Sequence, residues 1–268
     1  MQVDYIYEKG SGKLNEDFYF VNSSVFGVFD GATSLTRDVY ENGLTGGYLA
    51  SSIAGRTFYK NGSSLKELSK KANSKVYKAM EERGVRLDRK ETLWSTSFAV
   101  VRIKEDSFEW AQTGDCIVLA IYEDESSEIL TKNFDHDLET LMLWKKTSKN
   151  SGDNIMNVVG DKIAEVRANM NVTYGVLNGE KEALKFFKYG EKSLKGLKNI
   201  LIFTDGLFIP KENPKEKQDF SLFKRLFLDG GLENIKSYIR DLEENDINCH
   251  KYPRFKTHDD IAAVSLTL

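Results

Sequence analysis

Apolar runs separated by short polar breaks predict strands that come in pairs. Residues 15–31, NEDFYFVNSSVFGVFDG, contain two apolar runs around the polar NSS, which predicts two strands joined by a turn. Residues 95–103 and 107–123 predict further consecutive antiparallel strands, with KED and TGD as turns. Short apolar runs in residues 199–206 and 258–268 each predict one more strand. The strands are therefore expected in antiparallel groups.

Between these groups, apolar residues recur at helical spacing. Helices are predicted at residues 44–59, 63–84, 134–150 and 232–244. The second of these starts with Ser64 and Glu67 in the spacing of a capping box. Residues 151–180 show no legible pattern, and residues 210–219, PKENPKEKQD, predict a charged loop. Strand groups with helices between them favour a layered α+β fold in which helices pack on sheets.

Composition and charge narrow the range of functions. The chain has 268 residues, 40% of them hydrophobic, and no composition break divides it, so a single domain over residues 1–268 is expected. Lys and Arg (38) are interspersed with Asp and Glu (41), which argues against nucleic acid or an anionic membrane as partner. No apolar run predicts a membrane span and the first residues do not form a signal-peptide pattern. Two distant cysteines favour a reduced, cytoplasmic setting.

Aspartates stand at the ends of several predicted strands. Asp30 follows VFGVF, Asp205 follows ILIFT, Asp115 lies in the turn before CIVLAIY, and Asp259 and Asp260 precede the last strand. Each Asp-Gly pair alone is more often a simple turn than a ligand. If the strand ends converge on one rim, however, the carboxylates repel one another unless a cation neutralises them. Oxygen ligands without a Cys or His cluster favour Mg²⁺ or Mn²⁺.

The motifs, taken in order, resemble those of the PPM or type 2C metal-dependent protein serine/threonine phosphatases over nearly the whole chain. The similar segments are NEDFYF, VFGVFDG, STSFAVV, TGDC, FDHDLE, ILIFTDGLF and HDDIAAVSL. Each motif alone is weak, but seven in the correct order are strong evidence. The resemblance implies an α+β fold, a four-layer α-β-β-α sandwich with two antiparallel sheets packed face to face and helices on both outer sides.

The resemblance also implies roles for individual residues. Asp30 would bridge two metal ions, Gly31 would offer its carbonyl to one of them, and Asp205 and Asp259 would hold the other. Asp115 would recruit a third, weaker ion, so two or three Mn²⁺ or Mg²⁺ ions are expected.

Neighbouring acidic residues complete the implied site. Glu16 and Asp17 would accept hydrogen bonds from metal-bound water, with Asp17 nearer the metal as an alternative. Asp260 stands where the family usually has Asn, which leaves open a swap of ligand between Asp259 and Asp260.

The chain differs from the family motif at the positions that bind the phosphate group. Gly12 occupies the position of a common phosphate-binding arginine, so Lys13 and Arg37 are the candidates for phosphate binding, with ordinary surface cations as the equally weighted alternative. The histidine proposed as general acid in some members is also absent after Gly31. For the three histidines, His136, His250 and His258, structural or solvent-facing roles are favoured. His258, next to Asp259, is the main exception, with support of the metal ligands or proton donation as the alternative.

The leading prediction is metal-dependent hydrolysis of phosphoserine and phosphothreonine in proteins by a two-metal-activated water, without a phosphoenzyme intermediate. The partner would be a phosphorylated protein, and the enzyme a monomer in cytoplasmic signalling. One alternative is a phosphatase of small phosphate esters. Another is a catalytically silent relative that binds phosphoproteins, which the missing arginine permits and the four retained aspartates disfavour.

Overall fold

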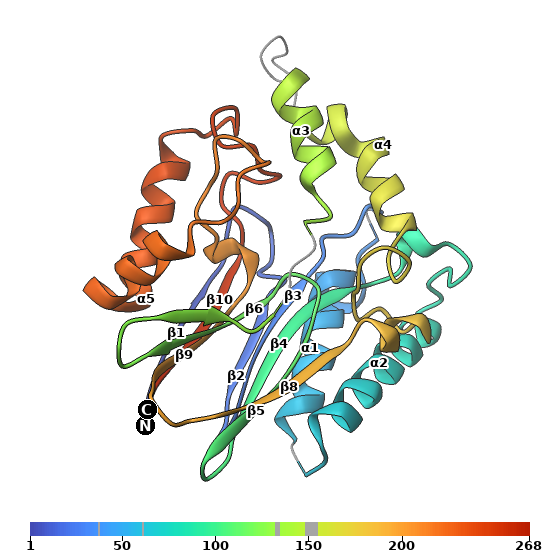
Figure 1. The fold of residues 1–268 in the computed structure, drawn as a ribbon. Coiled ribbons are helices and arrows are strands. Elements are labelled where there is room, and N and C mark those ends of the chain that lie inside the picture. Colours follow the sequence, from blue (N-terminus) through green and yellow to red (C-terminus); the bar gives the residue numbers. More distant parts are fainter. Residues whose placement is uncertain (37, 61, 132–134, 148–154) are drawn as a thin grey trace.

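Two antiparallel sheets form the centre of the molecule in the computed structural model, which describes residues 1–36, 38–60, 62–131, 135–147 and 155–268 (Figure 1). Within these ranges each sheet has five strands, in the order β1-β10-β9-β6-β7 in one and β2-β3-β4-β5-β8 in the other. The strands are β1 (Gln2–Glu8), β2 (Phe18–Val21), β3 (Val25–Gly31), β4 (Thr96–Ile103), β5 (Ser107–Thr113), β6 (Ile117–Tyr122), β7 (Ser127–Ile129), β8 (Lys188–Ser193), β9 (Leu197–Phe203) and β10 (Ile261–Thr267).

The central strands are apolar throughout because both of their faces are buried. Along β3, Phe26 and Val28 face the core between the two sheets, whereas Phe29 belongs to the core under the helices. Along β9, Ile202 faces the inter-sheet core and Leu201 faces the opposite side. Side chains alternate along a strand, so a strand between two cores needs apolar residues at every position.

Helices cover the outer face of each sheet (Figure 1). The helices α1 (Gly46–Tyr59) and α2 (Leu65–Glu82) pack on the sheet that contains β3, and α5 (Phe220–Glu244) packs on the sheet that contains β9. The remaining helices, α3 (Leu138–Thr147) and α4 (Ile155–Ala168), stand at the end of the sandwich. The predicted α-β-β-α sandwich is confirmed.

The predicted elements are found with changes at their boundaries. The capping box of Ser64 and Glu67 is present at the start of α2. The helix predicted at 134–150 is α3, although residues 134 and 148–150 lie outside the described residues. The last helix begins at Phe220, earlier than predicted, and changes direction at Gly231, whose φ is 70°. The sequence pattern did not predict β1, β7, α4 or β8. Among the described residues, no helix has the length and apolar character needed to cross a membrane.

Candidate metal centre

Three aspartates from distant parts of the chain converge at one edge of the sandwich. Asp30 is the penultimate residue of β3, Asp115 lies between β5 and β6, and Asp205 follows β9. One carboxylate oxygen of each lies within 4.8 Å of those of the other two. Ile117 pairs with Phe203 in the β6–β9 ladder, which brings Asp115 and Asp205, each two residues further, to the same edge. The predicted convergence of these strand ends is observed.

The glycines that follow two of these aspartates allow the backbone to pack closely. A Cβ atom on Gly31 would lie 2.4 Å from the carbonyl oxygens of Glu16 and Gly47. On Gly206 it would lie 1.9 Å from the carbonyl oxygen of Asp260. Neither distance is compatible with a side chain. Both Asp-Gly pairs therefore do more than turn the chain, because the glycines let neighbouring loops close around the carboxylates.

Each carboxylate makes the ionised form of its neighbours less favourable. Burial raises the pKa of Asp30 well above its ordinary value, and the negative charges of Asp17 and Asp115 raise it further. Burial likewise raises the pKa of Asp205, to which Asp30 and Asp115 add. Asp115 is buried, and its Oδ1 atom has no hydrogen-bond partner among the described residues. Buried, repelling carboxylate oxygens with an unpartnered acceptor fit a hard divalent cation.

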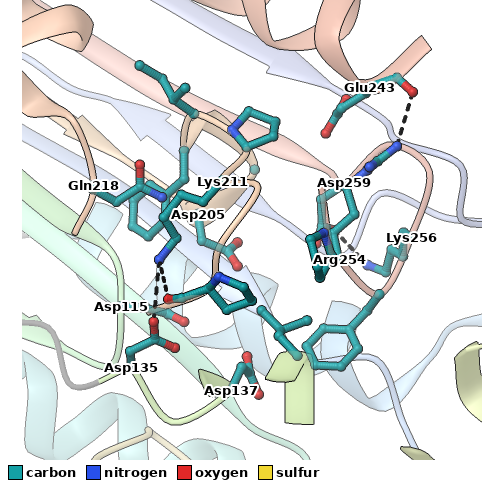
Figure 2. A pocket seen from close by; sticks show the side chains of 18 of the residues that line it. Asp115, Asp135, Asp137, Asp205, Lys211, Gln218, Glu243, Arg254, Lys256 and Asp259 are labelled. Atoms are coloured by element: carbon teal, nitrogen blue, oxygen red, sulfur yellow. Dashed lines mark hydrogen bonds and ion pairs between the residues drawn. The ribbon is translucent and has the colours of Figure 1, made fainter. Parts of the chain in front are cut away.

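Asp259 lines the same cavity but is not one of the three clustered carboxylates. Its Oδ1 atom accepts hydrogen bonds from Lys256 Nζ at 2.7 Å and from the backbone N–H of Asp260 at 2.9 Å. Figure 2 shows Asp259 and Lys256 together on the loop before β10, on the other side of the view from Asp115. Asp259, which the sequence predicts as a metal ligand, therefore already forms an ion pair with Lys256 in the cavity wall.

Threonine hydroxyl groups donate hydrogen bonds to the carboxylates of Glu16 and Asp17, two further residues predicted for the site. Asp17 is buried, and its Oδ2 atom accepts a hydrogen bond from Thr204 Oγ1 at 2.7 Å. Glu16 accepts hydrogen bonds from Thr45 Oγ1 at 2.6 Å and from Thr33 Oγ1. Burial raises the pKa of Asp17 well above its ordinary value, with Thr204 acting in the opposite direction. Both carboxylates are therefore fixed in orientation close to the cluster, but neither belongs to the set of three.

Comparisons with known proteins test the fold implied by this site. No family model and no curated protein sequence matches the chain. Solved structures do. The Mycobacterium tuberculosis serine/threonine phosphatase PstP/Ppp matches with a TM-score of 0.62 and 13% identity, over 100% of this chain and 98% of that one. Stp1 from Staphylococcus aureus matches with a TM-score of 0.60 and 17% identity, over 100% and 94%.

A third structure bears on the metal. The catalytic domain of PstP in complex with two manganese ions matches with a TM-score of 0.60 and 11% identity, over 98% of this chain and 96% of that one. The chain has the PPM phosphatase fold. The fold predicted from the seven motifs is thereby confirmed. At these identities the likeness concerns the fold, so the chemistry of this chain depends on its own residues.

Within this PPM fold, Lys13, one of the two residues predicted to bind phosphate, does not line the cavity that the carboxylates line. Lys13 lines a neighbouring cavity, and the carboxylate-lined cavity, of about 300 Å³, does not include it. Arg37 lies outside the described residues. Both therefore remain predictions.

Two other cations occupy the wall of the carboxylate-lined cavity. Arg167, from α4, extends into it and donates a hydrogen bond from Nη2 to the carbonyl oxygen of Thr33. Lys256 is the second. Burial alone would lower the pKa of Lys256, but the charges of Asp259, Asp260 and Glu16 outweigh it and raise the pKa. Sequence reasoning missed both, although Lys256 stands only three residues before Asp259.

His136 and Asp137, which precede α3, also line the cavity. The His136 ring stacks on Tyr174 at 4.2 Å between centroids, and its Nε2 atom lies 3.5 Å from Asp137 Oδ2. Burial raises the pKa of Asp137, a cavity residue that the sequence did not single out. His258 Nδ1 lies 2.9 Å from Glu243 Oε2, away from the carboxylate cluster. The structural roles expected for the two histidines stay predictions.

Proposed function

We propose that residues 1–268 form one metal-dependent phosphatase domain that hydrolyses phosphoserine and phosphothreonine in proteins. The observation that carries the proposal is the convergence of Asp30, Asp115 and Asp205 around an unpartnered Asp115 oxygen. The manganese complex of a protein with the same fold supports it. Monomeric state, cytoplasmic location and a role in signalling stay predictions.

The donor set is suited to two or three hard cations, Mn²⁺ or Mg²⁺. Asp30, the Gly31 carbonyl, Asp205 and Asp259 would hold two of them, and Asp115 would hold a further one. When bound, such ions would supply a water of lowered pKa for in-line attack on phosphorus. Glu16 and Asp17, whose carboxylates accept hydrogen bonds from threonine hydroxyls, would accept hydrogen bonds from metal-bound water.

The cations of the cavity suit a phosphate group. The guanidinium of Arg167 offers several N–H donors in a plane, and the ammonium of Lys256 adds a point charge. We assign phosphate binding to these two residues, in place of the arginine that the family motif has where this chain has Gly12. Their charges also offset the repulsion that an incoming phosphate would meet from the aspartates.

The environment of Cys116 disfavours this residue as a protein nucleophile. Cys116 lies next to Asp115, but its thiol is fully buried. Burial and the nearby carboxylates raise the pKa of Cys116 well above its ordinary value, which opposes formation of a thiolate. This supports direct attack by water, without a phosphoenzyme.

The proposal is tested by hydrolysis of p-nitrophenyl phosphate and of a phosphothreonine peptide with Mn²⁺, with Mg²⁺ and with EDTA. Turnover of both substrates with metal, and loss of turnover in EDTA and in Asp30→Asn, are expected. Asp229→Asn, which changes an exposed carboxylate on α5, is the matched control and keeps activity. Turnover that persists in EDTA contradicts the metal mechanism. Inactivity with every metal supports the silent phosphoprotein-binding alternative, and turnover of the small ester alone supports the small-ester alternative.

A further inference from the structure

A second, larger cavity adjoins the candidate metal centre. Its volume is about 770 Å³, against about 300 Å³ for the cavity lined by the carboxylates. Thr33, Phe255 and Lys256 line both, so the two spaces meet at these residues. We call the larger cavity the side groove. Its walls are residues 11–14, residues 247–250 and side chains of α3 and α4. When a phosphate group binds at the metal centre, the side groove is open to the part of the substrate that carries this phosphate.

The walls of the side groove are tied to one another by long-range contacts. Ser11 donates from its backbone N–H and from Oγ to the carbonyl oxygen of His258, at 2.8 and 3.0 Å. Trp144 Nε1 on α3 donates to the carbonyl oxygen of Cys249 at 2.8 Å. Phe255 packs against the apolar cluster that contains Trp144. The groove is therefore a built feature of the fold, which lowers the cost of ordering a bound chain.

The charged side chains that line the side groove differ in whether they already have partners. Glu16 keeps its negative charge, but its oxygens accept hydrogen bonds from two threonine hydroxyls, and Lys256 forms an ion pair with Asp259. Lys13, in contrast, makes no hydrogen bond or ion pair with the part of the chain that the structure describes. The rest of the lining combines apolar side chains, such as Leu14 and Ile247, with uncharged polar ones, such as Thr45 and Asn248. A mixed apolar groove with one unsatisfied cation complements a polypeptide segment that carries a carboxylate.

We propose that the side groove receives the polypeptide next to the phosphorylated residue, and that Lys13 selects substrates with an Asp or Glu in that segment. The inference rests on the proposed phosphatase function and specifies its substrate class as acidic phosphoproteins. It gives Lys13 a role that differs from phosphate binding. The phosphate group meets Arg167 and Lys256, whereas the flanking carboxylate meets Lys13.

The test compares three phosphothreonine peptides of equal length, with Asp, Asn or Lys at the positions flanking the phosphothreonine. The ratio of kcat/KM between peptides is measured for the wild type, Lys13→Glu and Lys13→Arg, with p-nitrophenyl phosphate as reference for each preparation. The wild type is expected to prefer the Asp peptide over the Asn peptide by about two- to fivefold, the worth of an exposed ion pair. Lys13→Glu should reverse the preference toward the Lys peptide, and Lys13→Arg should keep the wild-type order. Lys66→Glu, the same change on an exposed residue of α2, should leave the ratios unchanged.

The outcomes separate this inference from the proposed function. Metal-dependent turnover of p-nitrophenyl phosphate with equal rates for the three peptides overturns the inference and leaves the phosphatase function intact. An equal fall for all peptides and for p-nitrophenyl phosphate in Lys13→Glu also overturns it, because Lys13 would then bind phosphate. If nothing is hydrolysed, fluorescence anisotropy of the same peptides decides. Tighter binding of the Asp peptide that is lost in Lys13→Glu supports the groove, and equal binding of all three overturns it.

Discussion

The carboxylate of Asp260 holds the backbone of Glu16, 244 residues away in the chain, through a hydrogen bond of 2.9 Å from the Glu16 N–H to Oδ2. Its Oδ1 atom accepts a second hydrogen bond, of 2.7 Å, from the backbone N–H of Gly10. The start of β10 thus fixes the loop that brings Glu16 and Asp17 to the candidate metal centre. Since both oxygens of Asp260 serve the backbone, we assign the metal-ligand role to Asp259.

The two neighbouring aspartates should therefore respond differently to substitution. Asp260→Asn replaces one acceptor by an amide N–H₂, so we expect the free energy of unfolding to fall by about 1–3 kcal/mol. Asp259→Asn loses only the partly exposed ion pair with Lys256, so it should lower the free energy of unfolding by no more than about 1 kcal/mol. It should weaken Mn²⁺ binding at least about tenfold. Urea unfolding and calorimetric titration with Mn²⁺ measure the two effects. The opposite pattern, with affinity lost only in Asp260→Asn at unchanged stability, would establish the ligand swap.

The repulsion among the carboxylates predicts a mutant that is more stable than the wild type. The pKa of Asp30 is higher in the folded chain than in the unfolded chain, so the native state holds its proton more tightly. In EDTA, stability should fall as the pH rises from about 4, the unfolded pKa, through the folded value. Asp30→Asn stays neutral, and at pH 7 we expect its unfolding free energy to exceed that of the metal-free wild type.

Adding Mn²⁺ should reverse this order, because the ions stabilise only the chain that binds them. Urea unfolding at pH 4, 5.5 and 7, with EDTA and with Mn²⁺, checks both statements. An Asp30→Asn protein that is less stable than the wild type in EDTA at pH 7 would show that Asp30 has a structural partner rather than a metal.

Arg167 should act on substrate rather than on metal. Removing a charge-assisted contact to phosphate costs about 1.5–3 kcal/mol. Arg167→Ala is therefore expected to lower kcat/KM for p-nitrophenyl phosphate by about ten- to a hundredfold, mainly through KM, and Arg167→Lys to recover part of the loss. Arg225→Ala, an exposed arginine of α5, is the control. Arg167 also donates to the Thr33 carbonyl, so a purely anchoring role would appear as weaker Mn²⁺ binding and lower stability at unchanged KM.

Gly31 should not tolerate even a methyl group. Gly31→Ala forces Cβ against the carbonyl oxygens of Glu16 and Gly47, each 2.4 Å away, so the backbone must move. We expect a loss of about 1–3 kcal/mol in unfolding free energy, together with weaker Mn²⁺ binding. Gly160→Ala, in α4, has open space around the new atom and should be neutral or stabilising. Equal stability of Gly31→Ala and the wild type would show that this close approach is not required.

The predictable part of the site lies where local pattern and tertiary structure agree. Asp30 and Asp205 end strands that are buried on both faces, so an unbroken apolar run stops visibly at a charged residue. Asp115 is predicted from its position in the TGD turn between two predicted strands. That these three meet depends on the β6–β9 register and on the stacking of the sheets, which no single segment encodes.

The unpredicted part depends on contacts between distant segments. Within α4 the apolar residues are irregular, and Arg167 reaches the cavity because α3 and α4 pack on Phe255 near the end of the chain. The sequence does not predict the strands β1 and β8 for a different reason. Of the residues of β1 only Ile6 is buried, and β8, KYGEKS, has no buried residue, so neither edge strand shows apolar alternation.

The central claim, that the convergent aspartates bind divalent cations, is tested most directly by diffraction at the manganese absorption edge from crystals grown with Mn²⁺. The account predicts anomalous peaks within about 2–2.5 Å of the carboxylate oxygens of Asp30, Asp115 and Asp205. The peak beside Asp30 should be absent in Asp30→Asn. A wild-type crystal at saturating Mn²⁺ with peaks only on surface carboxylates, and none at this cluster, would contradict the account.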